Sequence, residues 1–298
     1  MKLKSYILCA LCLAAAGSAK AANPAAFDST ANYVGENLKA YIGQELIVRP
    51  RTADLQKMGY TRFFTSKSLA DVYQPAENHN STYEKLNGRT FKCVGVESRP
   101  IDATNQEKAE GWKTLPADSI YYLVLNDGTE TLYYKYTRFE GNFPFTVKGY
   151  QEKMKKQNVG DKYYLTNTTD KVWKDAVTNQ DFNLQMCSLW TVTDVALGAD
   201  GLTMCAVMKS TTGQTVNIGL KQIKSYFMTQ SYIDGLKRKY TPAVFNKTVI
   251  SHKINPGTPA ELLKVAFGEP TKIGKAATYQ IWFYGTQQVK IQNGKVVM

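Results

Sequence analysis

The feature that most constrains this chain is a hairpin signal between Ser119 and Tyr136. Two runs rich in aromatic and β-branched residues flank an Asp-Gly pair, Asp127-Gly128, which supplies the positive-φ positions that tight hairpin turns need. If this pair is a two-residue turn, Tyr122 lies opposite Tyr133. The sequence therefore predicts an antiparallel hairpin as the centre of a β domain.

Alternation along the two strands predicts one apolar face and one mixed face. The apolar face, which we expect to meet the core, carries Tyr121, Leu123, Leu125, Leu132 and Tyr134. The second face carries Tyr122, Val124, Thr131, Tyr133 and Lys135.

The second face is also the best local candidate for a binding surface. Tyr122, Tyr133 and Lys135 form an aromatic and basic strip, and Trp112 lies in the long polar loop before the hairpin, at residues 97–118. Aromatic side chains with one polar end suit the recognition of glycans or proteins. The alternative is that a second layer of the protein covers this face and makes both tyrosines ordinary packing residues.

The N-terminus has the composition of a secretory signal peptide. A basic start is followed by a short apolar run and by small residues up to Ala21. The apolar run is shorter than the roughly 20 residues that a membrane span requires. We expect cleavage near Ala21 and a periplasmic or secreted protein without a membrane span.

The net charge of the mature chain narrows the possible partners. Loss of residues 1–21 lowers the number of Lys and Arg residues from 37 to 34 against 25 acids, so the net charge falls from +12 to +9. A basic surface favours anionic partners such as acidic glycans, although it can also serve solubility alone. We expect no nucleic-acid partner.

Cys187 and Cys205 could form a disulfide, with buried free thiols as the alternative. No metal or other cofactor is expected, because the cysteines and the two histidines show no ligand spacing.

A short helix, a glycine and a strand recur three times, at residues 38–48, 83–94 and 154–166. Further strand signals follow the second and third copies. This pattern predicts a mainly β protein with two small antiparallel barrels or sheets, at residues 22–150 and 151–225. The element order resembles that of bacterial SH3-like β barrels.

Residues 226–298 are predicted to form a helix followed by an α+β module. A helix is expected within residues 226–240, and a second helix has Thr258 as its N-cap, Pro259 at its first position and Gly268 at its end. Three strands follow, at residues 279–284, 288–292 and 295–298.

Four stretches of this region carry a family resemblance. Together they resemble the SmpA/OmlA (BamE-like) fold, in which a helix leads into a three-stranded antiparallel sheet; they are Gly257-Thr-Pro-Ala-Glu-Leu-Leu, Phe267-Gly-Glu-Pro270, Trp282 with Tyr284, and Val289-Lys-Ile-Gln-Asn-Gly-Lys-Val296. The resemblance covers about the last 45 residues and implies an envelope protein that works through protein contacts. The chain lacks the lipid-carrying cysteine of the outer-membrane members, so their role in membrane assembly is not carried over. The whole chain looks like an exported protein of the Bacteroidota type.

Catalytic signatures are few. The chain has two histidines, His79 and His252, and no nucleophile, metalloprotease or phosphate-loop motif. Our leading interpretation is therefore an exported, non-catalytic binding protein of the bacterial envelope that contacts another protein or an anionic glycan. The alternative is a glycan-acting hydrolase that uses a pair of carboxylates, such as two among Asp118, Asp127, Glu130 and Asp194.

Overall fold

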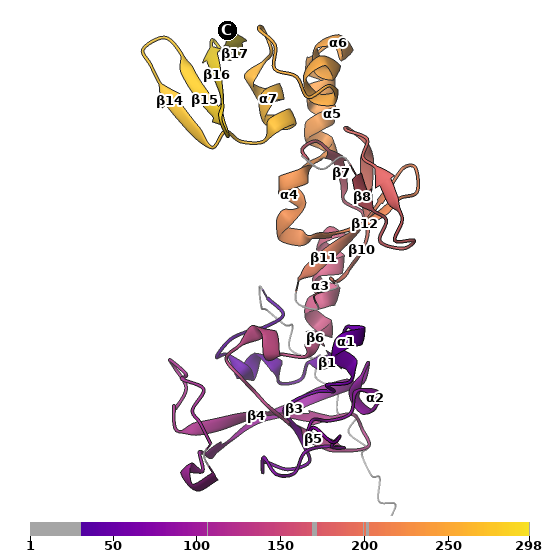
Figure 1. Ribbon diagram of the computed structural model, residues 1–298, viewed down its shortest axis with the longest axis vertical. Helices are drawn as coiled ribbons and strands as arrows, with labels where there is room; N and C mark the ends of the chain where they lie inside the picture. The colour runs from indigo at the N-terminus through magenta and orange to yellow at the C-terminus, as the bar shows by residue number, and fades with distance from the viewer. Residues whose placement is uncertain (1–30, 106, 169–171, 199, 201–202, 298) are drawn as a thin grey trace, which may run out of the picture.

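The computed structural model describes residues 31–105, 107–168, 172–198, 200 and 203–297. The expected signal peptide, residues 1–21, lies outside the described residues. The described chain is mainly antiparallel β structure, with three sheets that follow one another along the long axis of the molecule (Figure 1). This confirms the predicted fold class. None of the described residues belongs to a helix that is long and apolar enough to cross a membrane.

The first sheet is built on two long central strands and is strongly curled. Its strands, in the order in which they pair, are β2 (Phe63–Phe64), β5 (Thr131–Lys135), β4 (Ser119–Asn126), β3 (Thr90–Pro100), β1 (Glu45–Val48) and β6 (Phe145–Val147). The helical segments around it are short, namely η1 (Leu38–Tyr41), α1 (Ala53–Gln56), α2 (Tyr83–Leu86), η2 (Ala103–Asn105) and η3 (Glu140–Asn142). A bulge in β3 between Cys93 and Gly95 helps to bend the sheet.

The predicted hairpin is β4–β5, but its turn is longer than expected. Residues 127–130 form the loop, and Tyr122 pairs with Lys135 instead of Tyr133. The expected register was wrong because the side chain of Asp127 accepts hydrogen bonds from backbone N–H groups of the loop and stabilises a four-residue connection. A shift of two positions leaves every side chain on its predicted face. The five residues of the predicted apolar face are accordingly all buried in the main core.

The second sheet follows directly through a helix. α3 (Lys148–Asn158) starts where β6 ends and leads into the second sheet, so the expected domain boundary at residues 150–151 falls inside this helix. The strands pair in the order β12 (Thr215–Gly219), β11 (Met204–Ser210), β10 (Leu189–Leu197), β7 (Lys162–Leu165) and β13 (Phe227–Thr229). A small ribbon of β8 (Val172–Lys174) and β9 (Asp181–Asn183) lies beside it, and the buried cores of the first two sheets are continuous.

The C-terminal module begins after β13, which belongs to the second sheet although it lies beyond the expected boundary at residue 225. Its helical part contains α5 (Gln230–Lys239), α6 (Pro242–Phe245), a π-helical turn η5 (Asn246–Ile250) and α7 (Ala260–Phe267); η4 (Leu220–Gln222) and α4 (Ile223–Tyr226) precede β13. The third sheet has four strands rather than the expected three, in the order β14 (Lys272–Lys275), β15 (Gln280–Tyr284), β16 (Gln287–Gln292) and β17 (Lys295–Val297). α7 lies between α5 and this sheet, with Leu262 facing the helices and Leu263 facing the strands.

The start of α7 differs from the prediction. Thr258 is not an N-cap: the helix begins at Ala260 after Pro259, and no side chain caps it. The reason is that the segment before the helix is extended along β17, with the carbonyl of Thr258 accepting a hydrogen bond from the N–H of Val296. Pairing with the sheet therefore takes precedence over the local capping pattern.

The end of α7 was predicted correctly and gives a testable expectation. Gly268 has φ +80° and ψ −171°, a conformation that is essentially restricted to glycine. We expect Gly268→Ala to destabilise the C-terminal module by about 1–3 kcal/mol, measured by thermal denaturation. Gly235→Ala is the matched control, because Gly235 lies inside α5 with ordinary φ and open space around its Cβ position. This control should stabilise the helix by about 0.5–1 kcal/mol. A Gly268→Ala variant that is as stable as the unmodified protein would contradict the assigned helix end.

Candidate functional site

The structure does not bring the four predicted binding residues together on an open surface. Tyr122 and Tyr133 share one face of the hairpin, but residues 64–72 cover that face and the Tyr122 side chain is 0% exposed. Trp112 packs into the core on the opposite face. Lys135 is half-buried, and burial together with the nearby cation of Arg62 lowers its pKa. The alternative interpretation, a second layer over this face, therefore describes the packing of the two tyrosines.

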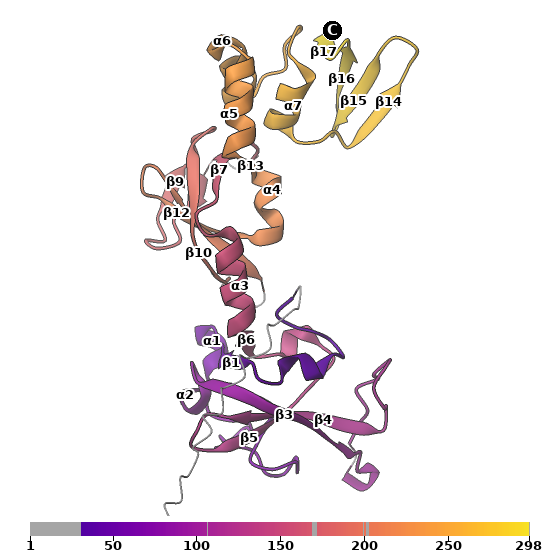
Figure 2. The same ribbon diagram turned by 180° about the vertical axis from the view of Figure 1, so that it is seen from behind.

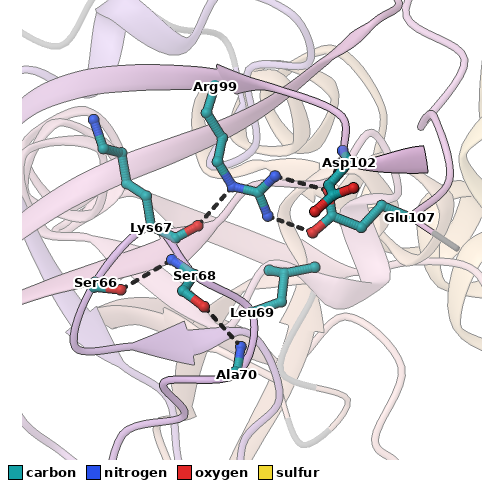
Figure 3. A pocket seen from close by; sticks show the side chains of 8 residues that line it. All are labelled: Ser66, Lys67, Ser68, Leu69, Ala70, Arg99, Asp102 and Glu107. Carbon is teal, nitrogen blue, oxygen red and sulfur yellow. Dashed lines mark hydrogen bonds and ion pairs between the residues drawn. The ribbon is translucent and has the colours of Figure 1, made fainter. Parts of the chain in front are cut away.

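A polar hollow of about 660 Å³ lies beside this second layer, lined by residues 66–70 together with Arg99, Asp102 and Glu107 (Figure 3). Tyr122 donates a hydrogen bond to the carbonyl oxygen of Lys67 at 2.8 Å, so this predicted binding residue anchors the wall of the hollow from beneath. The Nε of Arg99 donates to the same carbonyl at 2.7 Å. The hollow is thus held in shape by polar contacts that run through its walls.

Arg99 and Glu107 neutralise each other in the hollow. Both terminal nitrogens of Arg99 contact the Glu107 carboxylate, which also accepts a hydrogen bond from the backbone N–H of Asp102. The contact with Arg99 is the main reason why the pKa of Glu107 lies below its ordinary value. Sequence reasoning missed this pair because residues 97–118 were expected to be a loop, whereas β3 continues to Pro100 and presents Arg99.

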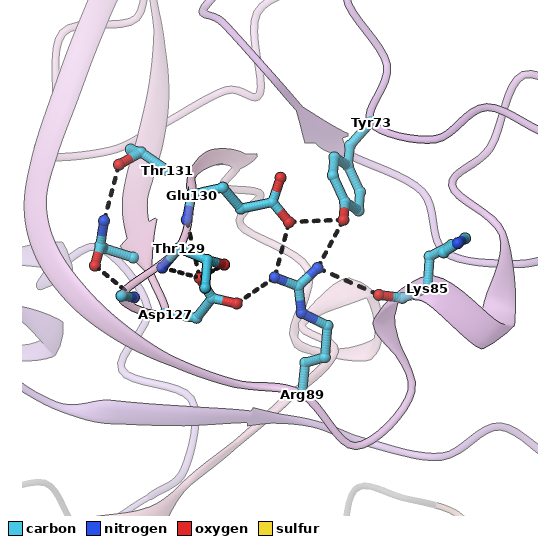
Figure 4. Close-up of polar contacts among 9 residues, drawn as sticks. Tyr73, Lys85, Arg89, Asp127, Thr129, Glu130 and Thr131 are labelled. Atoms are coloured by element: carbon cyan, nitrogen blue, oxygen red, sulfur yellow. Dashed lines mark hydrogen bonds and ion pairs between the residues drawn. The ribbon is translucent and has the colours of Figure 1, made fainter.

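Two of the candidate catalytic carboxylates also converge on an arginine (Figure 4). Arg89 contacts Asp127 and lies 2.8 Å from Glu130, whose carboxylate accepts a further hydrogen bond from the hydroxyl of Tyr73 at 2.7 Å. Burial opposes the ionisation of Asp127, but hydrogen bonds from Arg89 and from the turn outweigh this effect and hold its pKa below the ordinary value. A carboxyl group whose pKa lies below its ordinary value is unsuited to the general-acid step of glycoside hydrolysis.

The remaining candidate acids and the cysteines do not form a second site. Asp118 precedes β4 in the first sheet, whereas Asp194 lies on β10 in the second sheet and pairs with Lys155 at 3.0 Å. The three cysteines of the described chain are free thiols, so Cys187 and Cys205 are not bridged. Among the residues that the structure describes, no group of three or more His, Cys, Asp or Glu side chains could hold a metal ion.

The third sheet presents a different kind of surface, because the structure covers only one of its faces. α7 packs against the face that carries Trp282 and its buried neighbours on β16 and β17. Figure 1 and Figure 2, which show the molecule from opposite sides, place no other described element against this sheet. We call the opposite surface the open face; strand alternation and register assign to it Lys272, Gly274, Ile281, Phe283, Gln288, Lys290, Gln292, Lys295 and Val297.

The open face is strongly cationic. Lys272, Lys290 and Lys295 lie on three different strands, and β14 and β17 are three strand spacings apart, or about 14 Å. No aspartate or glutamate follows Glu269 in the sequence, so no residue of the sheet itself can neutralise these lysines. The arrangement can attract and hold a polyanion over the width of the sheet.

Two of these lysines are also held against aromatic rings. The Nζ of Lys290 lies 4.2 Å from the ring centre of Tyr279, just before β15, and the Nζ of Lys272 lies 5.8 Å from that of Phe283. Such contacts favour particular positions of otherwise flexible lysine side chains. Sequence reasoning missed the open face because β14 was not expected; the acid-free run after Glu269 is the signal that could have revealed it.

Comparison of the chain with protein-family models, curated proteins and solved structures gave no match. The resemblances to the BamE-like fold and to SH3-like barrels therefore stay predictions.

Proposed function

We propose that the protein is an exported, non-catalytic binding protein of the bacterial envelope, and that its open face contacts an anionic partner, either another protein or an anionic glycan. The observation that carries this proposal is the set of three lysines on one uncovered sheet face, in a stretch of sequence without acids. Export follows from the expected signal peptide. The envelope location is also what the BamE-like resemblance implies.

The paired carboxylates elsewhere support binding over hydrolysis. Asp127 and Glu130 share Arg89, and Glu107 is held by Arg99, so these acids stabilise loops of the first sheet. The glycan-acting hydrolase has less support, because a hydrolase needs one carboxylate that can deliver a proton at working pH.

Neutralising the lysines of the open face tests the proposal. The triple variant Lys272→Gln, Lys290→Gln, Lys295→Gln should be eluted from an immobilised polyanion at lower salt than the unmodified protein. We expect its affinity to fall about tenfold, since each exposed ion pair contributes only a fraction of a kcal/mol to about 1 kcal/mol.

The matched control removes three exposed lysines that lie outside the third sheet, on β7, β8 and β11, with Lys162→Gln, Lys174→Gln and Lys209→Gln. Both triple variants lose the same charge, so a difference between them reports the position of the lysines and not the net charge. Equal losses in the two variants would mean that attraction is a property of the whole basic protein, and the proposed site would be wrong.

A further inference from the structure

A glycine on the edge strand β14 leaves part of the open face without a side chain. Gly274 pairs with Ile281 across β14 and β15, so both residues belong to the open face. The φ of Gly274 lies outside the left-handed region, and a Cβ built there would lie 3.7 Å from Phe283 Cε2 and 3.8 Å from Ile281 Cβ, which are ordinary contacts. Neither the backbone nor crowding therefore requires glycine at a position where it weakens a strand.

The missing side chain creates a shallow apolar platform. The side chains of Ile281 and Phe283 are both partly exposed, and the edge of the Phe283 ring faces the space next to Gly274. Lys272, on β14, lies beside the ring of Phe283. Lys290, on β16, is the direct cross-strand neighbour of Ile281. A flat apolar area with a cation on each side fits a ring-shaped group that carries negative charge.

We infer that the partner of the open face is an acidic polysaccharide, with one sugar ring lying over Gly274 against Ile281 and Phe283 and its acidic groups on Lys272 and Lys290. This inference rests on the proposed function and names the chemical class of the partner. The C–H faces of a sugar ring pack on apolar surface, while the amides of Gln288 and Gln292 on β16 can both donate to and accept from hydroxyls.

The same geometry disfavours the two other polyanions. Nucleic-acid bases stack on the faces of aromatic rings, but Lys290 lies over the Tyr279 ring and Lys272 beside the Phe283 ring. A protein partner of high affinity usually inserts a large side chain into a desolvated pocket, whereas the platform over Gly274 is shallow.

Binding to four defined polymers at one ionic strength tests the inference. Polygalacturonate supplies acidic sugar rings, polyglutamate supplies charge without rings, dextran supplies rings without charge, and poly(dT) supplies charge with bases. We expect polygalacturonate to bind at least tenfold more tightly than polyglutamate or poly(dT), and dextran to show no measurable binding.

Filling the platform provides the decisive variant. Gly274→Thr replaces glycine by a residue that favours strands, so the thermal midpoint should stay the same or rise, while the affinity for polygalacturonate should fall to that for polyglutamate. Ile281→Ser should have the same effect on binding. Its matched control is Ile273→Ser, the same substitution on the neighbouring β14 position that points away from the open face.

The outcomes separate this inference from the proposed function. Equal binding of polyglutamate and polygalacturonate, tighter binding of poly(dT), or full polygalacturonate binding by a folded Gly274→Thr variant would each overturn the sugar platform. In those cases the lysine triple variant can still lose affinity, and the proposed anion-binding function would stand. If the lysine triple variant binds every polymer like the unmodified protein, the proposed function itself is wrong.

Discussion

Replacing Phe143 with alanine should destabilise the protein by about 3–5 kcal/mol, the cost that is typical of removing a fully buried phenyl ring. Phe143 is 1% exposed. Its ring centre lies within 6.4 Å of those of Tyr33, Tyr41, Tyr134, Tyr136 and Phe145. Because these rings are rigid and several are fixed by hydrogen bonds, they cannot collapse into the space that the variant leaves.

Denaturant unfolding of Phe143→Ala measures this effect. Phe139→Ala is the matched control, since Phe139 is four residues earlier in the same connection and its side chain is 61% exposed. The control should change the free energy of unfolding by less than about 0.5 kcal/mol. If the two variants are equally stable, the Phe143 ring does not contribute to stability as its close packing against the neighbouring rings implies.

Replacing Arg89 with methionine should destabilise the protein by about 2–3 kcal/mol at neutral pH. Methionine retains much of the packing of the aliphatic part of the arginine side chain. It lacks the guanidinium group, whose carbon lies 4.6 Å from the ring centre of Phe91. The change removes the cation that Asp127 and Glu130 share, so that two partly buried carboxylates lose their positively charged partner.

The effect of Arg89→Met should depend on pH. The pKa of Asp127 is lower in the folded protein than its ordinary value. Its contribution to stability is therefore fully present above about pH 4, the value for an unfolded aspartate, and is lost as the pH falls towards the folded pKa. The difference in stability between the unmodified protein and the variant should accordingly be large at pH 7 and smaller at pH 3.

Denaturation at these two pH values tests the coupling. Lys148→Met is the control, because Lys148 pairs with Glu45 at 2.6 Å but both side chains are about half exposed. Exposed ion pairs of this kind contribute little, so we expect a change within about 0.5 kcal/mol at either pH. A stability loss in Arg89→Met that is the same at pH 3 and pH 7 would show that packing, and not the ion pair, accounts for it.

The candidate site shows where sequence reasoning stops. The aromatic strip on the hairpin was predicted from alternation, and alternation placed Tyr122 and Tyr133 on the correct face. Whether a sheet face is open, however, depends on segments that are distant in the sequence. Residues 64–72 cover this face, while no element of the described chain covers the open face of the third sheet.

The sequence alone determined the features that depend on neighbouring residues. Period-two alternation defined the two faces of β4 and β5, and Gly268 ended α7, because strand pleating and positive φ are local properties of the backbone. Only the tertiary structure decided the four-residue turn of the hairpin, the replacement of the Thr258 cap by pairing with β17, and the addition of β14 to the third sheet. In each of these cases a hydrogen bond or a strand pairing outweighed the local propensity, and pairings between strands cannot be obtained from the periodicity of either strand. The open face was decided in the same way, since its lysines become one surface only when four strands lie side by side.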